Sequence, residues 1–328
     1  MSGKFLLQIV GITSGKILTG QSSSGSSSGS VEDVLLMNSK ERVKAHIPSL
    51  TGDGDGDGDS MTTIGSDVLV AYCPNEPEQE TPYSHTVFLS IQKELDAQQH
   101  SRTQVIGINP KIADELMESA LEKKLISNVP PIKQYKRNVP MFLTGKVDSS
   151  FSFVGICEDD IPFVMEVNNV PCAEYNHGAE LHQAYAEAAA LKKEDGEAAA
   201  AAVSIFAQDA EPIKIKLMED NEEEDEHYRS KVAYFPAKNN KNTAELIKRI
   251  HELTTIRKES VIRCFLGYVI ERTDVERFEF SMYNKEYRQA VQEAIENGVD
   301  IVPLMVNWTK DGVAFFVTDE LPMVYPLV

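Results

Sequence analysis

The chain has 328 residues, of which 42% are hydrophobic and 8% aromatic, and this length and apolar content favour two folded domains. Its 51 acidic and 32 basic residues give a formal net charge of −19, which repels nucleic acid and anionic membranes at long range. No apolar run approaches the length of a membrane-spanning helix, so we expect no membrane partner.

The first 93 residues predict a small, closed, OB-like β-barrel, because short apolar runs alternate there with turn residues. The runs are Phe5–Ile12, Val34–Met37, Arg42–Ile47, Val68–Tyr72 and Val87–Ile91. Two low-complexity loops interrupt this domain, a Ser/Gly run at 21–30 and a segment at 52–60 in which glycine and aspartate alternate. Neither loop has the apolar content that would offset the entropy cost of ordering it.

From residue 94 to residue 328, strands alternate with helices, which predicts an α/β domain. Asn109 and Pro110 indicate the start of one helix, as an N-cap and a first-turn proline. A second helix is expected after Asn242, because Glu245 three residues later completes the pattern of a capping box. A third helix is expected over 284–296, followed by an Asn-Gly stop signal.

The strands of this second domain enclose one long insertion. They comprise a hairpin over 141–167 that turns at Glu158–Asp160, and three further strands at Val261–Ile270, Val299–Val306 and Val313–Val317. The insertion, at about 174–230, joins an Ala-rich stretch to an acidic run. Between residues 174 and 227 it holds 15 acidic residues and 4 lysines, so it carries −11 of the net charge and leaves −8 for the rest of the chain.

The cysteines give no sign of a metal centre. They are Cys73, Cys157, Cys172 and Cys264, and because no two form a CxxC pair, the sequence predicts neither a zinc site nor a disulfide framework. The first ten residues are too interrupted for a signal peptide. We therefore expect an intracellular protein, cytoplasmic or nuclear, without a cofactor.

Six stretches of the chain follow a familiar order and spacing. They are Val43–Pro48, Thr81–Tyr83, Val105–Asn109, Phe163–Val170, Ala233–Pro236 and Val261–Pro322. Together they resemble the sugar fermentation stimulation proteins, the SfsA family, over nearly all of the chain outside the insertions. The resemblance implies an OB-like barrel followed by a PD-(D/E)XK nuclease-type domain, in a DNA-binding protein linked to the regulation of sugar metabolism.

The resemblance also locates a nuclease-type site that this chain has altered. In that superfamily an Asp on one strand and a Glu-x-Lys on the next hold a divalent metal and steady the attacking water. The matching positions here are Ser152, Glu166 and Asn168, so both the Asp and the Lys are replaced. Because Mg²⁺ needs several hard oxygen ligands, the pattern predicts a degenerate site without catalysis. Glu166 is the residual metal candidate, and Mg²⁺ is expected only if this site is functional.

Seven basic residues are candidates for contact with the phosphate backbone of DNA. They are Lys133, Lys136, Arg137, Lys238, Lys241, Lys248 and Arg249. The first three lie just before the hairpin, and the other four occupy the start and the outer face of the helix that follows Asn242. Because the chain is acidic overall, any binding of DNA is expected to be weak.

Three functions are compatible with these patterns. The first is the family-implied role in DNA binding and regulation, without nuclease catalysis. The second is a protein-interaction module on a pseudo-nuclease fold, which would bind protein partners through the acidic insertions. The third is a divalent-metal-dependent nuclease with relocated ligands. Salt-dependent DNA binding would separate the first two, and metal-dependent cleavage would identify the third.

Overall fold

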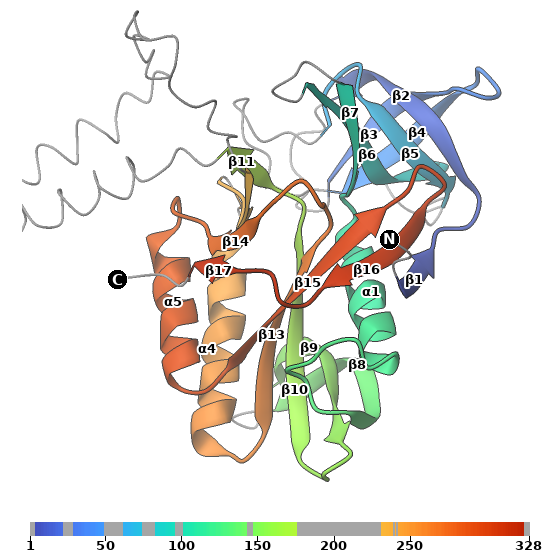
Figure 1. Ribbon diagram of the computed structural model, residues 1–328. Helices are drawn as coiled ribbons and strands as arrows, with labels where there is room; N and C mark the ends of the chain where they lie inside the picture. Colours follow the sequence, from blue (N-terminus) through green and yellow to red (C-terminus); the bar gives the residue numbers. More distant parts are fainter. Residues whose placement is uncertain are drawn as a thin grey trace, which may run out of the picture. The chain divides into compact units, whose positions relative to one another are not determined.

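A computed structural model describes residues 4–21, 29–48, 62–73, 83–95, 101–142, 147–175, 231–238, 240 and 242–324 (Figure 1). The described residues up to Glu174 and from Lys231 onward belong to one compact unit. The acidic insertion and the Gly/Asp loop at 52–60 lie outside the described residues. The Ser/Gly run does so only over 22–28, because both of its ends are strand.

Five strands form a closed barrel near the N-terminus, which confirms the predicted OB-like domain. They are β2 (Ile12–Gln21), β3 (Gly29–Leu36), β4 (Arg42–Pro48), β5 (Asp67–Tyr72) and β6 (His85–Leu95). In the sheet order β4-β3-β2-β5-β6, a short parallel pairing of Ala45 with His85 closes the ring between β4 and β6. Its interior is filled by branched apolar side chains such as Val34, Val68 and Val87, all fully buried.

One strand prediction for this region was wrong. The run Phe5–Ile12 is not one barrel strand, because the chain turns at Gly11, where φ is +72°. Its first part, β1 (Lys4–Gln8), pairs with β16 (Val313–Thr318) in the other domain's sheet. The barrel sheet also extends past residue 93, since β7 (Ser101–Gly107) pairs with β6.

The second domain is built on a seven-stranded sheet in the order β1-β16-β15-β13-β10-β9-β8. Its other strands are β8 (Ile132–Phe142), β9 (Val147–Cys157), β10 (Pro162–Val170), β13 (Arg263–Ile270) and β15 (Asp300–Trp308). The central strands β10, β13 and β15 run parallel, as expected of a sheet covered by helices. A smaller sheet holds β11 (Ala173–Tyr175), β12 (Lys231–Phe235), β14 (Arg277–Phe280) and β17 (Met323–Val324).

Helices cover the two faces of the large sheet (Figure 1). On one face, α1 (Pro110–Glu122) buries side chains such as Leu116 and Met117 against the sheet. On the other face, α4 (Thr243–Glu259) and α5 (Lys285–Glu296) pack their buried side chains into a second core. None of the helices in the described part of the chain combines the length and apolar character that crossing a membrane requires.

The helix caps allow a matched pair of substitutions. Asn109 caps α1 as predicted, since its Oδ1 accepts a hydrogen bond from Lys111 N at 3.1 Å. Asn242 at the start of α4 makes no such bond with its side chain, so the predicted capping box does not form. Asn109→Ala is therefore expected to lower the free energy of unfolding by about 1 kcal/mol, and Asn242→Ala by only a few tenths. Urea denaturation of both variants would check this, and equal losses would contradict it.

A buried carboxyl group joins the barrel to the large sheet. Glu271, just after β13, is fully buried, and its backbone oxygen accepts a hydrogen bond from Gly107 N at 3.1 Å. Its Oε2 accepts another from Trp308 Nε1 at 2.9 Å, while Oε1 has no hydrogen-bond partner among the described residues. A Cβ atom at Gly107 would lie 1.4 Å from Glu271 Oε2, so only glycine leaves room for this carboxyl group.

Candidate functional site

Ser152 and Glu166 meet where strands β9 and β10 separate. Their antiparallel ladder ends at the pair Phe153 and Met165. Beyond this pair, side-chain hydrogen bonds connect the two strands. Glu166 Oε2 accepts a hydrogen bond from Ser152 N at 3.4 Å. Ser152 Oγ accepts one from Val167 N at 3.2 Å. The hairpin thus brings together the two residues that the resemblance pointed to.

The carboxylate of Glu166 is held by an arginine. Glu166 is 4% exposed, and its Oε1 forms an ion pair with the guanidinium of Arg249 on α4. The Nε atom of Arg249 also lies 3.5 Å from Glu245 Oε1 on the same helix. Arg249 was expected on the outer face of α4 as a DNA contact. Its guanidinium instead points to the sheet, where it compensates the charge of the buried Glu166 carboxylate.

Burial controls the ionisation of Glu166. Desolvation raises the pKa of this carboxyl group to about 7, while the Arg249 guanidinium and the Ser152 N–H act in the opposite direction. The charged form is therefore maintained by Arg249.

A second carboxylate, that of Asp114 on α1, lies near this site and was not among the predicted site residues. Burial raises the pKa of Asp114, and the nearby Ser152 hydroxyl and Arg137 guanidinium partly oppose this shift. Arg137 lies 4.0 Å from Asp114 Oδ2 and donates to Glu118 Oε2 at 3.0 Å. The only sequence signal was an acidic pair four residues apart beside the apolar stripe of α1, a spacing that surface helices commonly show.

Asn168 takes a structural role at the position of the missing lysine. It is 7% exposed, and its Nδ2 donates a hydrogen bond to Gly267 O at 3.4 Å, which ties β10 to β13. A neutral amide in this place supplies no positive charge to a phosphate or to an attacking water.

These residues do not fit a bound divalent metal ion. A hard cation needs several oxygen ligands directed at one point. Within the described ranges, no three Asp, Glu, His or Cys side chains are grouped closely enough to hold one. Glu166 is already paired with Arg249, and the neighbouring positions carry the neutral side chains of Ser152 and Asn168.

The other basic candidates are partly paired with carboxylates. Lys133 donates to Asp160 at 2.6 Å, and Lys248 lies 3.6 Å from Glu252. Lys136 on β8 is exposed and has no carboxylate partner among the described residues.

Two candidates remain near the start of α4. Lys238 is exposed, and its ammonium group lies 5.0 Å from the ring centroid of Tyr283. Lys241 lies outside the described residues. Among the described residues, fewer of the basic candidates are therefore free of a carboxylate partner than the sequence suggested.

Comparisons with known proteins agree with this architecture. The sequence model described as the sugar fermentation stimulation protein RE domain matches residues 225–312. A solved structure of SfsA from Pyrococcus furiosus in complex with Ca²⁺ has a similar fold, with 12% sequence identity and a TM-score of 0.60. The similarity covers 98% of this chain and 99% of that chain. A search of curated proteins found no match. The chain therefore shares the fold of this SfsA structure, with an OB-like barrel at its N-terminus, and its residues 225–312 match the SfsA family model.

Proposed function

We propose that this protein binds nucleic acid in a regulatory role and does not cleave it. One observation carries the proposal: the guanidinium of Arg249 is paired with Glu166, where a metal-dependent nuclease would hold its divalent ion. A guanidinium supplies positive charge but activates no water, so the site keeps an electrostatic element and lacks the catalytic one.

The case for nucleic acid comes from the family and from the barrel. The SfsA resemblance implies DNA binding, and OB-fold barrels commonly bind oligonucleotides. On the folded chain, Lys136 and Lys238 are the exposed cations of the candidate set without a carboxylate partner among the described residues. Lys133 also contributes, because an exposed ion pair such as that with Asp160 stabilises little and is easily exchanged for a phosphate.

Fluorescence anisotropy would test the binding. The full chain is expected to bind a labelled 30-nucleotide DNA weakly at 25 mM KCl, with an affinity that falls log-linearly as salt rises. The double variant Lys136→Glu/Lys238→Glu is expected to bind roughly tenfold more weakly and to lower the salt slope by about 2. The matched control is Lys285→Glu/Lys310→Glu, two exposed lysines outside the candidate set. Absence of binding at low salt would exclude the proposal and favour a protein-interaction module.

A second candidate function, a nuclease with relocated ligands, is favoured by one observation. Asp114 lies against Ser152 and influences Glu166, so two carboxylates from different elements share this site. The Pyrococcus furiosus relative was determined in complex with Ca²⁺. Nicking of supercoiled plasmid that requires Mg²⁺ or Mn²⁺, and that is abolished by both Glu166→Ala and Asp114→Asn, would establish cleavage. We expect none above background.

A further inference from the structure

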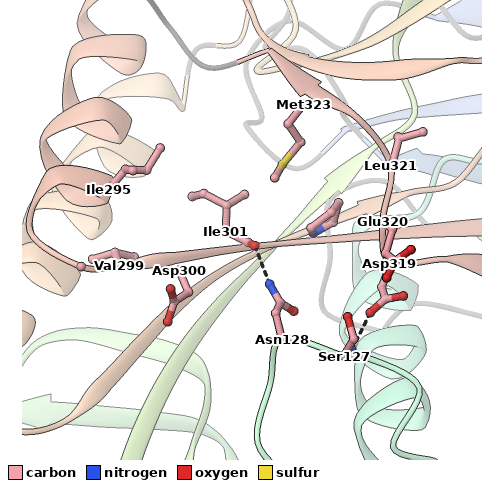
Figure 2. A pocket seen from close by; sticks show the side chains of 12 residues that line it. Ser127, Asn128, Ile295, Val299, Asp300, Ile301, Asp319, Glu320, Leu321 and Met323 are labelled. Atoms are coloured by element: carbon pink, nitrogen blue, oxygen red, sulfur yellow. Dashed lines mark hydrogen bonds between the residues drawn. The ribbon is translucent and has the colours of Figure 1, made fainter.

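A cavity of about 430 Å³ lies apart from the site described above, and none of its lining residues belongs to that site. It is bordered by Ser127 and Asn128 after α1, by the end of α5, by the start of β15 and by the chain between β16 and β17 (Figure 2). Its volume is in the range of small-ligand sites in proteins.

The edge of β15 forms part of its wall. Strand β15 pairs with β13 from Asp300 onward but with β16 only from Met305, so its first residues leave one edge open. Ile301 O on this edge accepts a hydrogen bond from Asn128 Nδ2 at 3.0 Å. Because alternate residues face the same side, Pro303 also faces this edge, and it has no N–H to offer. The edge therefore presents mainly acceptors and resists the addition of another strand.

The charged side chains around the cavity are all acidic. Asp300, Asp319 and Glu320 line it, together with no Lys, Arg or His side chain. Figure 2 shows Asp300 on the α5 side and Asp319 on the opposite side, next to Ser127, whose N–H donates to Asp319 Oδ2. None of these carboxylates forms an ion pair within the described part of the chain.

Two arginines lie near the Asp300 side of the cavity, although neither side chain lines it. Arg257 donates to the backbone oxygen of the lining residue Gly298 at 3.0 Å, and Arg263 pairs with Asp159. Burial raises the pKa of Asp300, and these two arginines partly oppose that effect.

Part of the lining is hydrocarbon, since the side chains of Ile295, Ile301 and Met323 border the cavity. Figure 2 shows Ile301 near the centre of the view, with the amide of Asn128 between Asp300 and Asp319. A ligand that matches this surface has an aliphatic middle and N–H donors at its ends. A single metal ion does not match it, because no three acidic side chains in the described ranges are grouped closely enough to ligate one.

We propose that this cavity binds an organic cation, in which an ammonium or guanidinium group is carried on an aliphatic stem. Two sources share this chemistry: a free polyamine, and the Lys or Arg side chain of a peptide. Carboxylates at opposite sides of the cavity would hold the N–H donors, and the aliphatic stem would cover Ile301 and Met323. This inference goes beyond the proposed nucleic-acid binding and does not depend on it.

Titration calorimetry on the full chain at 150 mM KCl would test the proposal, with spermidine, a short lysine-containing peptide and Mg²⁺ as separate probes. Spermidine or the peptide is expected to bind at one saturable site. Asp300→Asn/Asp319→Asn is expected to weaken that binding at least tenfold, because it removes the charge from both sides of the cavity. The control Glu259→Gln/Asp311→Asn removes two exposed carboxylates away from the cavity and is expected to leave the affinity unchanged.

The control also separates the cavity from the general acidity of the chain. Equal weakening in both double variants would mean that net charge, and not the cavity, attracts the cation, and would overturn the proposal. Absence of saturable binding by either organic probe, or equal affinity for Mg²⁺, would overturn it as well. Binding of the peptide alone would assign the ligand to a protein side chain, and binding of spermidine alone to a free polyamine.

Discussion

Arg249→Met is expected to lower the free energy of unfolding by about 3 kcal/mol at pH 8, because it leaves the buried Glu166 without its cationic partner. The loss should shrink toward pH 5. Without Arg249 the pKa of Glu166 rises above the value of about 7 that it has with its partner. A carboxyl group whose pKa is raised on folding stabilises the protein at low pH, and this contribution is lost as pH rises through the folded-state pKa. Urea midpoints of the variant and the unmodified chain, measured at pH 5 and pH 8, would show the difference.

Two further variants make this result specific to the ion pair. Glu166→Gln/Arg249→Met removes both partners and is expected to recover much of the lost stability and most of the pH dependence. Lys258→Met changes another cation of the same helix, whose partner Glu293 is exposed as it is itself, and is expected to cost less than about 0.5 kcal/mol. If Arg249→Met were as mild as Lys258→Met, Arg249 would not be what compensates the buried carboxylate.

Glu271 is expected to make the whole protein less stable as pH rises. Burial raises the pKa of this carboxyl group to about 8, and the hydrogen bond from Trp308 opposes the shift only partly. The folded chain therefore holds a proton that the unfolded chain releases from about pH 4.5 upward. Stability should fall through the window from 4.5 to 8, by an amount on the order of 5 kcal/mol.

Glu271→Gln would isolate this contribution, because glutamine keeps the shape and cannot titrate. The quantity to compare is the difference in unfolding free energy between pH 5 and pH 9. We expect it to be several kcal/mol smaller in Glu271→Gln than in the unmodified chain. The absolute stability of the variant is less informative about the pKa of Glu271. Its amide nitrogen would take the place of Glu271 Oε1, where no hydrogen-bond partner is found, and this costs stability at every pH. An unchanged pH dependence would show that Glu271 is ionised in the folded state.

Local signals in the sequence predicted much of the fold. Helix α1 starts at an asparagine cap and buries a regular apolar stripe, so both its position and its buried face could be inferred. The turn of the hairpin determined the register of β9 and β10, and the register in turn placed Ser152 opposite Glu166. In each case the structure depends on residues that are close together in the chain.

The features of the site that the sequence did not indicate depend on contacts between distant residues, whereas the capping box predicted at Asn242 failed locally. The direction of the Arg249 side chain depends on a carboxylate 83 positions earlier, and nothing in the α4 sequence indicates it. Asp114 is separated from Ser152 by the rest of α1, all of β8 and the first part of β9, and its spacing to Glu118 is common on the surface of helices. Helical periodicity shows which residues lie on one face, but it does not show which element covers that face.

The N-terminal strand has a consequence for how the chain can be divided. Although β1 precedes the whole barrel, it forms the edge of the large sheet by pairing Lys4 with Phe316 and Gln8 with Val313. The second domain is therefore discontinuous in sequence, and a fragment starting after the barrel would leave the edge of β16 without a partner and open to aggregation. During synthesis on the ribosome, β1 emerges before the barrel and must wait until β16 has been made, so completion of the large sheet is a late folding event.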